Sequence, residues 1–139
     1  MDSQHLEVIK DTHEILAIII RRNFTLEGIQ FFTPDNFSQQ LAFMHHRKGK
    51  KIRAHLHNAV KREVFFTQEV LFLKRGKLKV DLYRSDQTFH STLVLETGDT
   101  ILLAGGGHAF EVLEDIEMIE VKQGPYTGEA DKKYFEDRI

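Results

Sequence analysis

Three histidines and one glutamate in this chain have a spacing that is typical of metal ligands. One residue separates His55 from His57, and Glu69 and His108 follow later. If His55 and His57 lie on a β-strand, both imidazoles point to the same face, about 7 Å apart along the strand. A third imidazole and a carboxylate from neighbouring strands complete a set of three nitrogens and one oxygen. The sequence therefore predicts one site for a divalent transition metal, and iron, manganese, nickel, cobalt and zinc all suit these ligands.

The segments that must position these residues alternate between apolar and polar in short runs, which is typical of an all-β chain. A helix near the N-terminus competes with the first two strands, but the run Ile18–Ile20 favours strands. Turn residues are expected at 10–11, 34–35, 74–77, 85–86, 98 and 115. Strands are expected at 6–9, 14–21, 28–32, 38–44, 69–73, 78–83, 91–95, 100–103 and 118–121.

The glycine run before His108 predicts a tight turn that delivers this histidine into the fold. Three consecutive glycines, Gly105 to Gly107, lower the cost of positive φ and of close backbone approach. By the period of two, Phe110 and Val112 share the face of His108, so this side chain is expected to enter a largely apolar interior.

The two motifs resemble those of the cupins, which are small double-sheet jelly-roll barrels. The first motif runs from Gly49 over five residues to His55-Leu56-His57, then to Glu69, six further residues and Gly76. The second runs from Gly98 over five residues to Ala104-Gly105-Gly106, then Gly107 and His108.

The chain departs from the cupin pattern in four places. The eleven residues between His57 and Glu69 are more than the family has, and one residue is missing before His108. Ala104 and Val112 stand where proline and asparagine are usual. The resemblance covers about residues 37–121. It implies a jelly-roll barrel with added N-terminal strands and a short C-terminal tail, whose metal ligands are His55, His57, His108 and Glu69.

Several other side chains are candidates for ligand or substrate contact. Glu63 and Gln68 are alternatives to Glu69 as the oxygen ligand. Arg62 lies in the insertion 58–68; it can clamp a carboxylate or phosphate if this insertion folds over the barrel mouth, and a surface ion pair with Glu63 is the competing interpretation. Gln68 and Tyr126 are further candidates for substrate contact, and Glu69, Tyr83 and Tyr126 are candidates for a proton-moving base.

The tail from Glu120 to Lys132 is similar to those of small single-domain cupins from bacterial polysaccharide and sugar-nucleotide gene clusters, including those called WbuC-like. The resemblances imply a metal-dependent protein that binds or transforms a carbohydrate-type small molecule, with isomerase- or epimerase-like chemistry if a base is present. An iron(II)-dependent dioxygenase and a non-catalytic binding or sensor module remain alternatives. A homodimer is also expected, because barrels of this kind present exposed sheet edges.

Length, charge and composition limit the number of domains, the partners and the metal ligands that the chain is expected to have. A chain of 139 residues is expected to form one domain over 1–139. Its net charge of −2 favours neither nucleic acid nor an anionic membrane as partner. The chain has no cysteine, so a metal must be held by His, Asp or Glu.

The first residues lack a signal-peptide pattern and the apolar run 15–20 is too short to span a bilayer, so a cytoplasmic location is expected. The basic cluster 47–53 and the acidic stretch 111–120 are interpreted as solvated surface.

Overall fold

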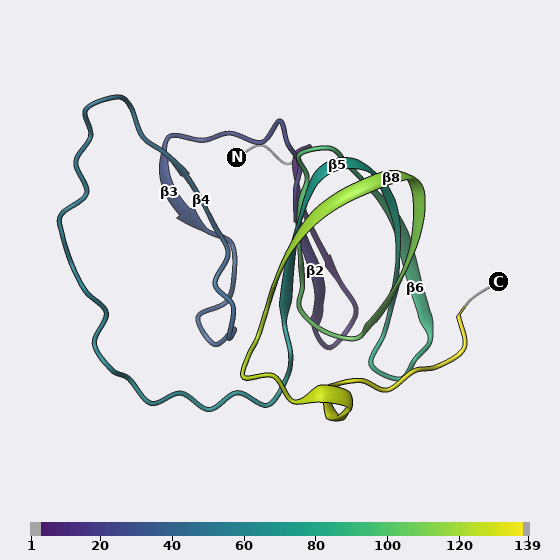
Figure 1. Ribbon diagram of the computed structural model, residues 1–139. Coiled ribbons are helices and arrows are strands. Elements are labelled where there is room, and N and C mark those ends of the chain that lie inside the picture. Colours follow the sequence, from purple (N-terminus) through teal and green to yellow (C-terminus); the bar gives the residue numbers. More distant parts are fainter. Residues whose placement is uncertain (1–3, 138–139) are drawn as a thin grey trace.

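A computed structural model describes residues 4–137 and contains eight strands and one short 3-10 helix (Figure 1). The all-β class is confirmed. Five strands form one path through the main sheet, in the order β1-β2-β7-β5-β6, and β8 pairs with β5; β3 and β4 form a separate hairpin, and every pair is antiparallel. The bounds are β1 Leu6–Lys10, β2 Ile15–Ile20, β3 Gly28–Phe31, β4 Ala42–His45, β5 Glu69–Tyr83, β6 Phe89–Glu96, β7 Thr100–Leu103, β8 Gly107–Lys122 and the 3-10 helix Gly128–Asp131.

The two N-terminal strands confirm the expected strand pair. The carboxylate of Asp11 accepts hydrogen bonds from the backbone N–H groups of His13 (2.7 Å) and Glu14 (2.8 Å), which stabilise the turn between β1 and β2. β2 then pairs with β1 on one side and with β7 on the other. Because both faces of β2 are covered, five consecutive residues, Leu16 to Ile20, are buried.

The turns expected at 74–77 and at Asp115 are wrong, because the chain bends there without reversing. β5 and β8 are continuous strands of 15 and 16 residues that pair along most of their length. The pairing register shifts between Leu73 and Leu78. Gly76 permits this irregularity: its φ is +110°, and a Cβ there would lie 2.2 Å from the backbone oxygen of Asp115.

This bend curls the sheet into a half-barrel, with β5 and β8 arching over the top of Figure 1. One half of β5 pairs with β7 and the other half with β6, so the two halves of the sheet face each other. A single apolar core fills the space between them; its buried members are Ala17, Ile19, Leu71, Leu73, Leu78, Val80, Leu82, Leu93, Leu95, Ile101 and Leu103.

The β3–β4 hairpin covers the outer face of this sheet. Phe32, Phe37 and Leu41, in the loop that connects β3 to β4, pack against Ile18 and Leu102 in a second apolar cluster. The strand expected over 38–44 is shorter than predicted and begins at Ala42. Over residues 4–137, we find no helix long and apolar enough to cross a membrane.

Residues 46–68, which we call the arm, connect β4 to β5 without any strand or helix. Every residue from 47 to 67 is exposed. Figure 1 shows the arm as a wide loop on the side of the β3–β4 hairpin that faces away from the main sheet. The expectation that His55 and His57 lie on a strand is therefore wrong for this structure.

Candidate functional site

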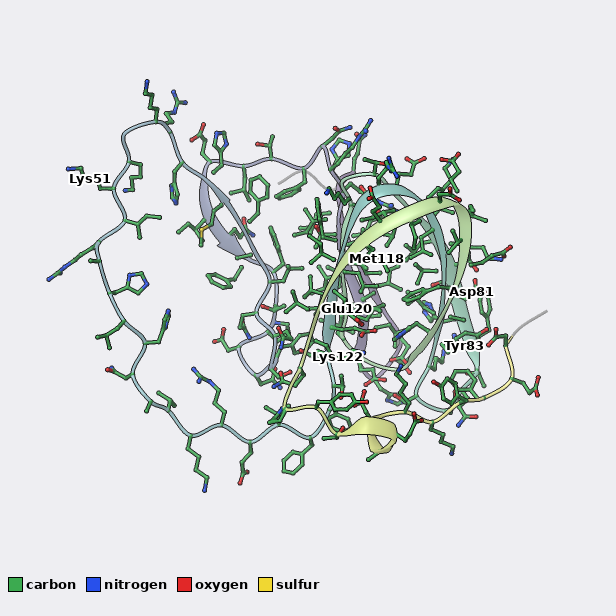
Figure 2. The ribbon with its side chains drawn as sticks, in the orientation of Figure 1. Lys51, Asp81, Tyr83, Met118, Glu120 and Lys122 are labelled. Carbon is green, nitrogen blue, oxygen red and sulfur yellow. The ribbon has the colours of Figure 1, made fainter. Side chains whose placement is uncertain are left out.

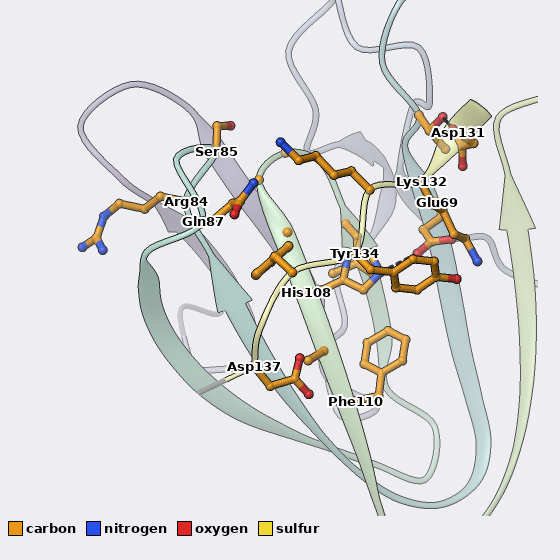
Figure 3. Close-up of a pocket in the computed structure, with 18 of the residues that line it drawn as sticks. Glu69, Arg84, Ser85, Gln87, His108, Phe110, Asp131, Lys132, Tyr134 and Asp137 are labelled. Atoms are coloured by element: carbon orange, nitrogen blue, oxygen red, sulfur yellow. Dashed lines mark hydrogen bonds and ion pairs between the residues drawn. The ribbon is translucent and has the colours of Figure 1, made fainter. Parts of the chain in front are cut away.

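A pocket of about 610 Å³ opens at the end of the half-barrel where β5 begins and β8 both begins and ends. Figure 3 shows its wall, to which β8 and the C-terminal tail contribute most of the labelled side chains. Charged and aromatic groups share this wall, and those used below are Glu69, His108, Phe110, Glu120, Lys122 and Phe135.

Strand pairing explains why these side chains point into the pocket. Residues directly opposite each other in an antiparallel pair project from the same face. Because Leu82, Val80 and Leu71 point into the core, their partners His108, Phe110 and Glu120 also face the interior of the half-barrel. Phe110 remains 41% exposed there, since β8 has no further strand beside it among residues 4–137.

The glycine turn and the tail complete the wall. Gly106 has a φ of +65° and lies so close to Tyr83 that a Cβ would be 2.1 Å from the Tyr83 backbone oxygen. This close approach leads the chain directly into β8 and positions His108. From the tail, the ring of Phe135 packs edge-on against Tyr83 with centroids 5.1 Å apart. This contact holds the tail against the half-barrel.

A cluster of four ionisable groups lies at the pocket wall. The Nε2 of His108 is 3.1 Å from Oε1 of Glu69, whose side chain is only 10% exposed. The ammonium of Lys122 is 3.4 Å from Oε2 of Glu69 and 3.2 Å from Oε1 of Glu120. Each of these groups therefore has a charged neighbour, as buried carboxylates require.

The pKa values of the Glu69 and Glu120 carboxyl groups shift in opposite directions. Burial opposes the ionisation of Glu69, but hydrogen bonds from His108 and Glu120, together with the charge of Lys122, lower the pKa of Glu69 to about 2. The hydrogen bond to Glu69 and partial burial raise the pKa of Glu120. The environment therefore favours the protonated form of Glu120 and the ionised form of Glu69.

The structure brings together two of the four predicted metal ligands. Glu69 and His108 share the cluster just described, whereas His55 and His57 lie on the exposed arm with their ring centroids 5.4 Å apart. The Nδ1 of His55 is 2.8 Å from the Arg53 carbonyl oxygen. Over residues 4–137, we find no group of three or more His, Asp or Glu side chains arranged to hold one metal ion. In this arrangement the four predicted ligands do not fit a single ion.

The other candidates fall outside the pocket. Arg62 and Glu63 lie on the exposed arm, which does not fold over the barrel mouth. Gln68 is buried and structural: its amide donates to the Ala104 carbonyl (3.3 Å) and accepts from the Gln39 N–H (3.1 Å). Tyr126 is 95% exposed, and Tyr83 is a buried core residue.

Sequence reasoning missed Glu120 and Lys122, because the acidic stretch was interpreted as solvated surface. Every second side chain of a strand faces the same side. Because Met118 packs against the core, Glu120 and Lys122 are expected to face inward as well. Figure 2 shows Met118, Glu120 and Lys122 in sequence along β8, far from Lys51 on the arm. Comparison of the chain with family models, with curated proteins and with solved structures finds no match.

Proposed function

We propose that this protein binds a polar, carbohydrate-type small molecule in the pocket beside Glu69 and His108. The observation that carries the proposal is the wall itself, where the charged cluster lies next to aromatic rings in a space of about 610 Å³. That volume is in the range of small-molecule sites, roughly 300–1,000 Å³. Carboxylates and a lysine suit the hydroxyl groups of a sugar, and aromatic faces suit its C–H groups.

Proton transfer within the bound molecule is the second part of the proposal. Neighbouring carboxyl groups whose pKa values shift in opposite directions are suited to separate acid and base roles. The raised pKa of Glu120 suits it to donate a proton, and ionised Glu69 lies 3.1 Å from Nε2 of His108. Such a group supports isomerase- or epimerase-like chemistry. A non-catalytic binding module would show the same affinity without turnover.

A metal-dependent reaction is a further possibility that rests on the cupin-like motif spacing. It requires His55 and His57 to reach His108 and Glu69, and the arm holds them elsewhere in this structure. We therefore assign no step to a metal ion. The dioxygenase alternative depends on the same four ligands and has no separate support.

Ligand-observed NMR with a panel of neutral sugars and sugar acids tests the binding proposal. Phe110, which lines the pocket, and Phe72, on the outer face of β5, are matched in exposure at 41% and 38%. Phe110→Ala is expected to weaken binding by about fivefold, since an aromatic contact contributes about 1 kcal/mol. Phe72→Ala is expected to leave affinity unchanged. If no member of the panel binds, or if both variants behave alike, the pocket is not the binding site.

A further inference from the structure

The outer edge of β8 is an open hydrogen-bonding edge. β8 is the longest strand, and over residues 4–137 it pairs with β5 alone. The side chains next to this edge include half-exposed apolar groups on both faces, with Val112 at 55% and Leu113 at 43% exposure. A long strand with free N–H and C=O groups and apolar side chains is a template for another strand.

The arm has the sequence of a strand but lacks a partner. From Ile52 to His57, apolar residues alternate with Arg53, His55 and His57. Alternation with this period is the pattern of a half-buried β-strand. Nevertheless, among the backbone hydrogen bonds of the described chain, none involves residues 51–66, and Leu56 is 80% exposed. Exposed apolar side chains in such a row mark a surface that is covered by a partner.

The two unpaired elements are complementary in charge. Residues 47–66 contain seven Lys or Arg and one Glu, whereas β8 contains five Asp or Glu and one Lys. Glu114 and Asp115 lie at the centre of β8, while the arm has basic groups near both of its ends. Opposite charges on the two strands favour their approach and disfavour pairing of two arms or of two β8 edges.

We propose that the arm of one copy of this chain adds as a strand to the free edge of β8 in a second copy. The arm of the same copy is poorly placed for this, because it lies beyond the β3–β4 hairpin (Figure 2). It also leads directly into β5, whose first residues already pair with β7 on one side and with β8 on the other. In a two-fold dimer each copy contributes one arm and one free β8 edge, so each arm pairs with the β8 edge of the other copy.

The exchange also determines what the partner's arm presents to the pocket. Successive residues of a strand face opposite sides, so a shift of one residue decides which face turns inward. One register covers Phe110 and Val112 with the apolar face of the arm, whereas the other brings His55 and His57 to the face of His108. The strand exchange itself depends on backbone pairing and is independent of this choice.

Cross-linking tests the exchange directly, since the chain has no cysteine. A chain with Leu56→Cys and a differently tagged chain with Leu113→Cys are mixed, allowed to re-equilibrate and treated with a short bis-maleimide. The expected product is a covalent heterodimer that carries both tags. Val8→Cys is the matched control, because Val8 is 48% exposed on β1 at another edge of the sheet, and it is expected to give no such product.

A charge exchange provides an independent readout of the same interface. Glu114→Lys is expected to raise the dimer dissociation constant by about tenfold in sedimentation. Arg53 lies diagonally across from Glu114 when Leu56 and Leu113 pair in antiparallel strands, so Arg53→Glu on the same chain is expected to restore dimer formation. A monomeric wild type at tens of micromolar would overturn the proposal. So would a cross-link that forms only within one chain carrying both Leu56→Cys and Leu113→Cys. Neither result bears on small-molecule binding, which is measured separately.

Discussion

Replacing Glu69 by glutamine tests the charged cluster, because it removes one charge and keeps the shape of the side chain. The pKa of Glu69 falls from 4.5 to about 2 in the folded protein, owing mainly to its hydrogen bonds with His108 and Glu120, which outweigh its burial. A carboxyl group whose pKa is lowered by folding stabilises the fold above its unfolded pKa. It loses this contribution as the pH falls toward its folded pKa.

The size of the effect follows from this shift. At about 1.4 kcal/mol per pH unit, Glu69 contributes about 3 kcal/mol at pH 7, and about 2 kcal/mol of that is lost by pH 3. Glu120 acts in the opposite direction, because its pKa is raised and its protonation is favoured by folding. We therefore expect wild type to lose about 1–2 kcal/mol more than Glu69→Gln between pH 6 and pH 3.

Urea unfolding at a series of pH values measures this difference. Glu117→Gln is the matched control, because Glu117 lies on β8, which pairs with β5, but is 54% exposed beside Arg75. Its free energy of unfolding is expected to follow that of wild type across the whole range. If Glu69→Gln and wild type change in parallel to within about 0.5 kcal/mol, the paired carboxyl groups are not linked to folding as we describe.

Two further predictions concern the glycine turn and the predicted metal. Gly106→Ala is expected to destabilise the fold by about 3 kcal/mol or more, whereas Gly128→Ala is expected to cost about 1 kcal/mol. Both glycines have φ near +65°, but only Gly106 has a backbone atom within 4 Å of the added Cβ. Equal losses in thermal unfolding would contradict the role of the Tyr83 contact. If the arm docks with its histidines facing inward, elemental analysis is expected to find about one transition metal ion per chain. His57→Ala should then lose the ion and His45→Ala should keep it; equal metal contents would exclude His57 as a ligand.

The sequence was most informative where one physical effect dominates locally. The isoleucine run of β2 and the apolar run of β7 were predicted as strands and are strands, since β-branched and apolar side chains favour buried extended chain. Gly76 was misjudged because the same positive φ serves a hairpin turn and a bulge within a strand. The difference depends on whether Asp115, distant in sequence, lies alongside.

The candidate site likewise combines residues that a local pattern identifies with contacts that only the fold creates. The amino-acid sequence by itself determined the all-β class and singled out Glu69 and His108, because the patterns that report them are short and local. Only the tertiary structure decided that these two meet Glu120 and Lys122 at the mouth of a curled sheet, while His55 and His57 project from the other side. Which side chains meet depends on how β5 and β8 bend and pair over their whole length. That pairing joins residues between 24 and 53 positions apart, which no local pattern encodes.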